Sequence, residues 1–169
     1  MSDSLIRITV GRESLWEALE TYAATKTLYN HKFKLDDDGA ALNELEPSIA
    51  QMPAIAIETG EGNPKWWLNV MQHWPITYKV TIWTPNWDQS VAERYLELTN
   101  EAFHRAVAAG RPGVTIVKDK TSWYPQTMAF RLRRVRLKSG KDTPGHKAMQ
   151  IDMTVVLFAD RNPLTYSGT

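Results

Sequence analysis

The chain has 169 residues, the usual size of one domain, and its 43% hydrophobic and 23% charged residues are typical of a folded globular protein. Lysine plus arginine (20) nearly cancels aspartate plus glutamate (19), so the formal net charge of +1 excludes a general attraction to nucleic acid or anionic lipid. The absence of cysteine excludes disulfides, thiolate metal ligands and cysteine nucleophiles.

The first predicted element is a helix over residues 12–29. Apolar side chains recur every three or four residues between Leu15 and Phe33, as they do along one buried face of a helix. A turn follows, formed by three acidic residues and a glycine: Asp36, Asp37, Asp38 and Gly39. This run resembles a calcium-binding loop, but its glycine and the later acidic residues do not fit the twelve-residue pattern, so we interpret it as a solvated turn.

Two strands are predicted next, over residues 53–58 and 76–83. The second strand alternates strictly between apolar and polar residues, as a half-buried strand does. Glycines and a proline after the first strand predict that residues 59–75 form a long loop. This loop carries Trp66, Trp67 and Trp74, and large aromatic side chains outside regular structure need a partner surface.

A second helix is predicted over residues 89–109. Asp88 or Ser90 can cap this helix. Ser90 and Glu93 have the spacing of a capping box, in which each side chain accepts a hydrogen bond from an otherwise unpaired backbone N–H. The predicted buried stripe of this helix consists of Val91, Tyr95, Leu98, Ala102 and Ala106. A short strand is expected after the helix, over residues 114–117.

Two long strands close the chain, over residues 127–138 and 149–157, and a polar loop between them indicates an antiparallel pair. Apolar residues of the first strand change from even to odd positions, which predicts a bulge at Arg133 and Arg134. Residues 160–169 are expected to form an extended C-terminal arm. The whole pattern predicts a single α+β domain over residues 1–169, with a mostly antiparallel sheet of four to five strands packed against two helices.

Motifs for catalysis or cofactor binding are not recognisable in the sequence. The four histidines are scattered without metal-ligand spacing, the glycines at residues 60–62 lack the rest of a phosphate loop, and no serine has the glycines of a nucleophile elbow. Residues 1–4 do not open a signal peptide, and the longest apolar stretch, residues 155–159, is too short to span a bilayer. We therefore expect no enzyme, no cofactor, no metal and no membrane association.

The densest charged feature is a basic strand formed by Arg131, Arg133, Arg134, Arg136 and Lys138. It is interpreted either as a solvated sheet face or as a surface for an acidic protein or for phosphates, since arginine pairs well with both. The seven tryptophans divide in the same way between core positions and interface anchors. Trp16 and Trp83 lie off the predicted apolar stripes, and five others flank turns, where interface anchors are common: Trp66, Trp67, Trp74, Trp87 and Trp123.

The order of these features carries a resemblance. A helix precedes a proline-led strand at residues 53–58, and a variable loop separates that strand from the stretch Trp74-Pro75-Ile76-Thr77-Tyr78-Lys79-Val80-Thr81-Ile82-Trp83. Next come a helix containing Val91-Ala92-Glu93-Arg94-Tyr95-Leu96 and a closing pair of strands. Over most of the chain, this order resembles the tail terminator and head-tail joining (neck) proteins of long-tailed bacteriophages.

The resemblance implies an α+β fold without a catalytic site and a structural role in the virion tail or neck, after assembly in the host cytoplasm. It implies closed rings, typically hexamers, that cap the tail tube and join it to the head. The partners would be copies of the same chain, the tail tube protein and neck or connector proteins, with passing contact to DNA in the lumen and none to a membrane. A head-to-tail interface between identical subunits closes into a ring when its rotation fits.

Chemistry alone, without any family motif, nominates the contact surfaces: the Asp36 to Asp38 turn, the Trp66 to Trp74 loop and the basic strand. A neck or head-completion connector ring is the alternative within virion proteins. From a different class, a small nucleic-acid-binding module would use the basic strand over residues 131–141, with Trp123 and Tyr124 as stacking platforms. An enzyme is a third alternative, for which the sequence nominates no residue.

Overall fold

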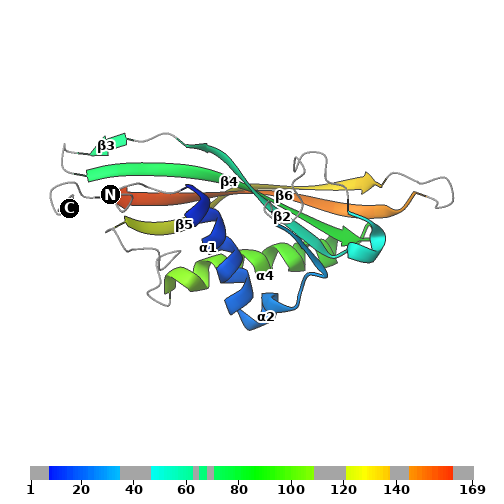
Figure 1. The fold of residues 1–169 in the computed structure, drawn as a ribbon. Helices are drawn as coiled ribbons and strands as arrows, with labels where there is room; N and C mark the ends of the chain where they lie inside the picture. Colours follow the sequence, from blue (N-terminus) through cyan, green and yellow to red (C-terminus); the bar gives the residue numbers. More distant parts are fainter. Residues whose placement is uncertain are drawn as a thin grey trace.

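A computed structural model describes residues 8–34, 47–62, 65–67, 71–108, 121–137 and 145–161. These residues form an α+β fold in which one mostly antiparallel sheet is covered on one face by helices (Figure 1). The fold class predicted from the sequence is confirmed. None of the described helices has the length and apolar character needed to cross a lipid bilayer.

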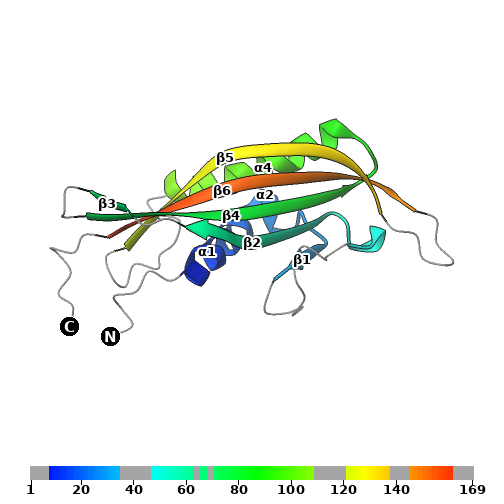
Figure 2. The same ribbon diagram turned by 90° about the horizontal axis from the view of Figure 1, so that it is seen from above.

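The strand order is β1-β2-β4-β6-β5, and β3 pairs with β4 beside this path. The bounds of the strands are β1 His31–Phe33, β2 Ala54–Gly62, β3 Lys65–Trp67, β4 Met71–Pro85, β5 Thr121–Arg136 and β6 Lys147–Arg161. Only the pairing of β1 with β2 is parallel among these strands. Figure 2 shows β1 and β5 along opposite edges of the sheet.

The helices are α1 Ile8–Thr21, the short α2 Ala23–Lys26, the single 3-10 turn η3 Ile49–Gln51 and α4 Gln89–Ala108. The first helix was predicted over residues 12–29, but α1 begins earlier and ends at Thr21. Tyr22 has extended backbone angles, and the Thr25 hydroxyl donates a hydrogen bond of 2.8 Å to the Leu19 carbonyl of the last turn of α1. This bond satisfies a carbonyl that a helix end leaves unpaired, so the chain can leave the helix there.

The main core lies between the sheet and the helices. It is built from alternating residues of β4 and β6, whose side chains share one face because successive residues of a strand point to opposite sides. The strand residues are Ile76, Tyr78, Val80 and Ile82 with Met149, Ile151, Met153, Val155 and Leu157, and all of them are buried. The alternation predicted for residues 76–83 and for the last strand is therefore confirmed.

The second helix follows its prediction in extent and partly in rotation. Ala102 is buried and Tyr95 packs against the core, as predicted, but Val91 is exposed and its neighbour Ala92 is buried in its place. Leu96 and Phe103, which the predicted stripe did not include, are also buried in the core. Of the two predicted caps, Asp88 is confirmed, and the capping box of Ser90 and Glu93 is wrong. Asp88 accepts hydrogen bonds from the backbone N–H groups of Ser90 (3.0 Å) and Val91 (3.4 Å), so the aspartate caps the helix.

A second apolar cluster lies on the other face of the sheet. Its buried members are Phe33, Met52, Ala54, Ala56, Trp83, Leu137 and Ala148. Trp83 therefore has a core role, in a cluster that the predicted stripes did not include. Val135 packs against the same cluster, which explains the change of parity in β5 without a bulge at Arg133 and Arg134. The register of β5 against β6 is continuous from Ala129 to Arg136, and the shift in that pairing falls between Thr127 and Ala129.

The loop predicted over residues 59–75 is largely strand. β2 continues to Gly62, β3 pairs with the beginning of β4, and only residues 63–64 and 68–70 fall outside the described part. A register shift between Thr59 and Gly62 accommodates the glycines within the pairing. At Gly60 an added Cβ would lie 3.1 Å from the backbone oxygen of Thr77, so the small residue permits a close approach of β4.

Other predictions concern the ends of the strands. β6 pairs as far as Arg161, so residues 160–161 belong to the sheet and not to an extended arm, while residues 162–169 lie outside the described part. The strand predicted at residues 114–117 and all but the last residue of the hairpin loop predicted at residues 139–145 also lie outside it.

Candidate interaction surfaces

The four described arginines of the basic strand do not form one stripe. Leu132 faces Ile151 of the main core, and residues 134 and 136 share its side of β5, whereas residues 131 and 133 point to the opposite face. The arginines of the predicted basic strand are therefore divided between the two faces of the sheet. Lys138 lies outside the described residues.

On the face away from the helices, Arg133 already has a partner. Its guanidinium lies 3.3 Å from a carboxylate oxygen of Asp152, and Gln150 donates a hydrogen bond of 2.9 Å to the same carboxylate. Arg131 is exposed beside this pair. Because a neighbouring acid already balances part of the charge, this face is a weak candidate for binding an anion.

On the helix side, Trp87 gathers three cations. The centre of its ring lies 4.5 Å from Lys147 Nζ, 5.4 Å from Arg136 Cζ and 6.0 Å from Arg134 Cζ. Such distances allow cation–π attraction. We call these four residues the basic surface. Its three cations have no carboxylate ion-pair partner within the described part of the chain.

The turn between β4 and α4 places Trp87 at this position. Pro85 is the last residue of β4, and Asn86 adopts the left-handed region at φ 70°, which asparagine tolerates better than most residues. The Asn86 N–H donates to the Lys147 carbonyl at 3.1 Å, and the Trp87 indole N–H donates to the Val135 carbonyl at 3.3 Å. Two backbone contacts thus hold the tryptophan beside the ends of β5 and β6.

The apolar exposure of β5 lies next to its register shift. Met128 is 57% exposed and Phe130 is 58% exposed, although both belong to the large apolar residues that a folded chain usually covers. Phe130 shares the side of β5 that carries Arg134 and Arg136.

The remaining predicted contacts are only partly described. Trp66 and Trp67 lie on β3 opposite Gln72 and Met71, and Trp74 lies on β4 opposite Ala159. Their side chains, like the whole of the Asp36 to Asp38 turn, are outside the described part. Within the described residues, no group of three or more histidines and acids is arranged to hold a metal ion.

Trp87 was predicted from the sequence to flank a turn and to be a candidate interface anchor, and it lies in the connection between β4 and α4. Sequence reasoning missed the cations around it. These are Arg134, Arg136 and Lys147, and only the pairing of β5 with β6 brings them to the tryptophan.

Comparison with models of known protein families gives no match, and a search of curated proteins gives no significant match either.

Proposed function

We propose that this protein is a structural virion protein: a tail terminator ring that caps the tail tube of a long-tailed bacteriophage and joins it to the head or neck. The observation that carries the proposal is the order of the elements. Helix α1, strand β2, the long strand β4, helix α4 and the pair β5 and β6 follow one another along the chain. This is the order on which the resemblance to the tail terminator and neck proteins rests.

Surface features give further support. A ring protein acts through contacts with copies of itself and with neighbouring rings, and exposed aromatic and arginine side chains are common anchors of such contacts. Phe130 and the basic surface supply side chains of this kind on the helix side of the sheet. A neck or connector ring would use the same features and differs from a terminator in its partners.

A nucleic-acid-binding module is the second candidate, and the basic surface is the observation that favours it. Arginines with an aromatic ring are suited to phosphates and stacked bases. The formal net charge of +1 gives no general attraction to a polyanion, so any such binding would depend on this local surface.

Electron microscopy and native mass spectrometry of the purified protein test the proposal. We expect a closed ring, a hexamer, that attaches to one end of polymerised tail tube protein from the same virion. A protein that stays monomeric at high concentration, also after addition of tail tube protein, would contradict it. If the protein is a connector, it should form a ring that binds neck proteins and does not bind the tail tube.

A further inference from the structure

An acidic face lies on α1, on the side away from the sheet. Glu13, Glu17 and Glu20 follow one another at helical spacing, and all three are exposed, while Leu15 and Leu19 between them are buried. We call the three glutamates the acidic surface. Glu20 pairs with Lys34 at 2.9 Å, whereas Glu13 and Glu17 have no ion-pair partner among the described residues.

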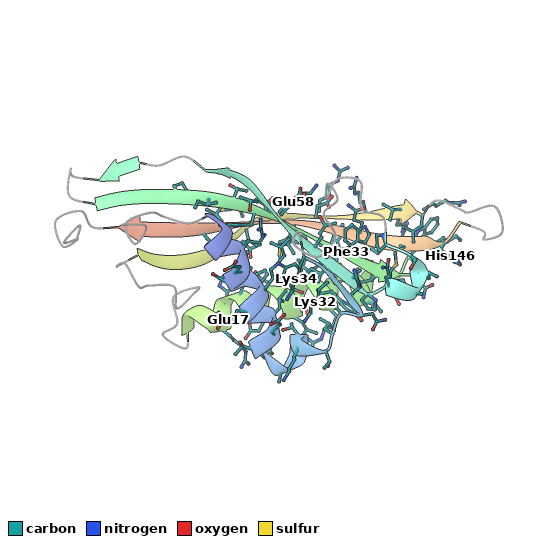
Figure 3. All side chains as sticks on the ribbon, in the orientation of Figure 1. Glu17, Lys32, Phe33, Lys34, Glu58 and His146 are labelled. Carbon is teal, nitrogen blue, oxygen red and sulfur yellow. The ribbon has the colours of Figure 1, made fainter. Side chains whose placement is uncertain are left out.

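The acidic and basic surfaces are far apart on one molecule. Figure 3 shows Glu17 on α1 well separated from His146, the residue that precedes Lys147 of the basic surface. One molecule therefore cannot join its own two surfaces. Each surface is left to meet a partner of opposite charge outside the molecule.

We propose that the basic surface of one copy docks on the acidic surface of a second copy. This inference rests on the proposed ring and names the interface that would build it. Two different surfaces of the same chain form a heterologous contact, which closes into a ring when its rotation fits. Every copy in such a ring uses both surfaces.

The spacing of the charges supports this pairing. Arg134 and Arg136 are two residues apart on one side of β5, about 6.6 Å along the strand. Glu13 and Glu17 are four residues apart on α1, about 6 Å along the helix axis. Two arginines and two glutamates can therefore pair simultaneously, and guanidinium groups suit carboxylates because they offer paired donors.

Nucleic acid is the other partner that the basic surface could take. The acidic surface favours a second copy over nucleic acid. A second copy gives Glu13 and Glu17 cationic partners, whereas a phosphate backbone would be repelled by these glutamates if it came near them. Exposed charge pairs are screened by salt over about 8 Å at physiological ionic strength. The interface should therefore weaken as salt is raised.

The test exchanges the charges of the two surfaces and measures oligomeric state by analytical ultracentrifugation and native mass spectrometry. The variants R134E/R136E and E13K/E17K should each weaken association on the order of 100-fold or more, since like charges then face each other. The swapped variant, which carries all four changes, should assemble again because each reversed surface meets a reversed surface. Circular dichroism checks that every variant is folded.

Matched controls carry the same change of charge elsewhere. E93K/E97K reverses two exposed glutamates with the same spacing on α4, and R94E/R131E reverses two exposed arginines outside the basic surface. Both controls should assemble like the unmodified protein. If a control dissociates as completely as the test variants, net charge and not the proposed contact governs association, and the inference is wrong.

The outcomes separate this inference from the proposed function. Rings that persist in R134E/R136E and E13K/E17K would overturn the interface but leave the terminator ring intact. Open chains or dimers that obey the charge swap would support the interface and contradict the ring. An unmodified protein that never associates overturns both. Unchanged assembly of R134E/R136E with loss of salt-sensitive binding to a DNA oligonucleotide would assign the basic surface to nucleic acid and overturn the inference.

Discussion

Replacing Gly11 with alanine should destabilise the fold, because Gly11 of α1 lies directly against side chains of β4 and β6. An added Cβ would lie 2.9 Å from Cζ of Tyr78 and 3.1 Å from Cδ1 of Leu157, and closer still to the Tyr78 hydroxyl. Tyr78 and Leu157 are fully buried in the main core. Neither side chain can turn out to solvent to make room.

Two opposing effects set the magnitude. Alanine favours a helix over glycine by about 1 kcal/mol, whereas overpacking a core costs about 1–3 kcal/mol. Ordinary contact begins at 3.4 Å, so the Tyr78 ring and the helix would have to separate by 3.4 − 2.9 Å, or 0.5 Å, at Cζ alone and by more at the hydroxyl. Because these side chains have no room to move, we expect the overpacking cost in the upper part of its range, about 2–3 kcal/mol. After the helix gain is subtracted, the free energy of unfolding should fall by about 1–2 kcal/mol.

Urea unfolding followed by tryptophan fluorescence measures this loss, at one fixed protein concentration because association also affects stability. Tyr78→Phe removes the hydroxyl, so Gly11→Ala should cost less in that background than in the unmodified protein. The double-mutant cycle subtracts the separate cost of losing the hydroxyl. A Gly11→Ala protein that is as stable as the unmodified one would refute the close packing of α1 on Tyr78.

Three further predictions concern other parts of the fold. Trp83→Ala should lower the free energy of unfolding by about 3–5 kcal/mol, because Trp83 is buried in the second cluster. Trp87→Ala removes a partly exposed ring and should lower it clearly less. Equal losses in urea unfolding would contradict this. Hydrogen bonds from Ser90 and Val91 lower the pKa of Asp88, so the stability that Asp88 contributes is present above pH 3.8 and is lost as the pH falls through the lowered pKa. Asp88→Asn should abolish this part of the acid sensitivity. Superimposable acid unfolding curves of the variant and the unmodified protein would argue against it. Burial raises the pKa of Tyr29 and Tyr78 above 10, so the stability that these raised pKa values contribute is complete below pH 10 and is lost at higher pH. An absorbance titration in which all six tyrosines ionise together near pH 10 in the folded protein would contradict this.

The strongly periodic elements were predictable from the sequence. Residues 76–83 alternate so regularly that both the strand and its buried face were correct, and the extent of α4 was correct to one residue. The exact rotation of α4 was not, because Val91 and Ala92 are both apolar and only the packing against the sheet decides which of them is buried.

The errors have a common physical cause in the two-sided burial of the sheet. A period-two pattern identifies one apolar face, so Val135 and Leu137 were interpreted as a bulge although they cover a second cluster. The glycines after residue 59 predicted the end of a strand, but a register shift keeps them in the sheet. The basic surface could not be found from the sequence because strand pairing, and not sequence spacing, brings its residues together.

The outer edge of β5 carries charges that oppose pairing with strands of other molecules. Among the described strands β5 pairs only with β6, so this strand of sixteen residues has backbone groups along its outer edge with which a further strand could pair. Positive side chains project to both sides of that edge, Arg131 and Arg133 on one and Arg134 and Arg136 on the other, so a second β5 aligned alongside would meet repulsion whichever way it faced. Removing these four arginine charges should therefore allow the β5 edges of different molecules to pair and to stack as in amyloid fibrils.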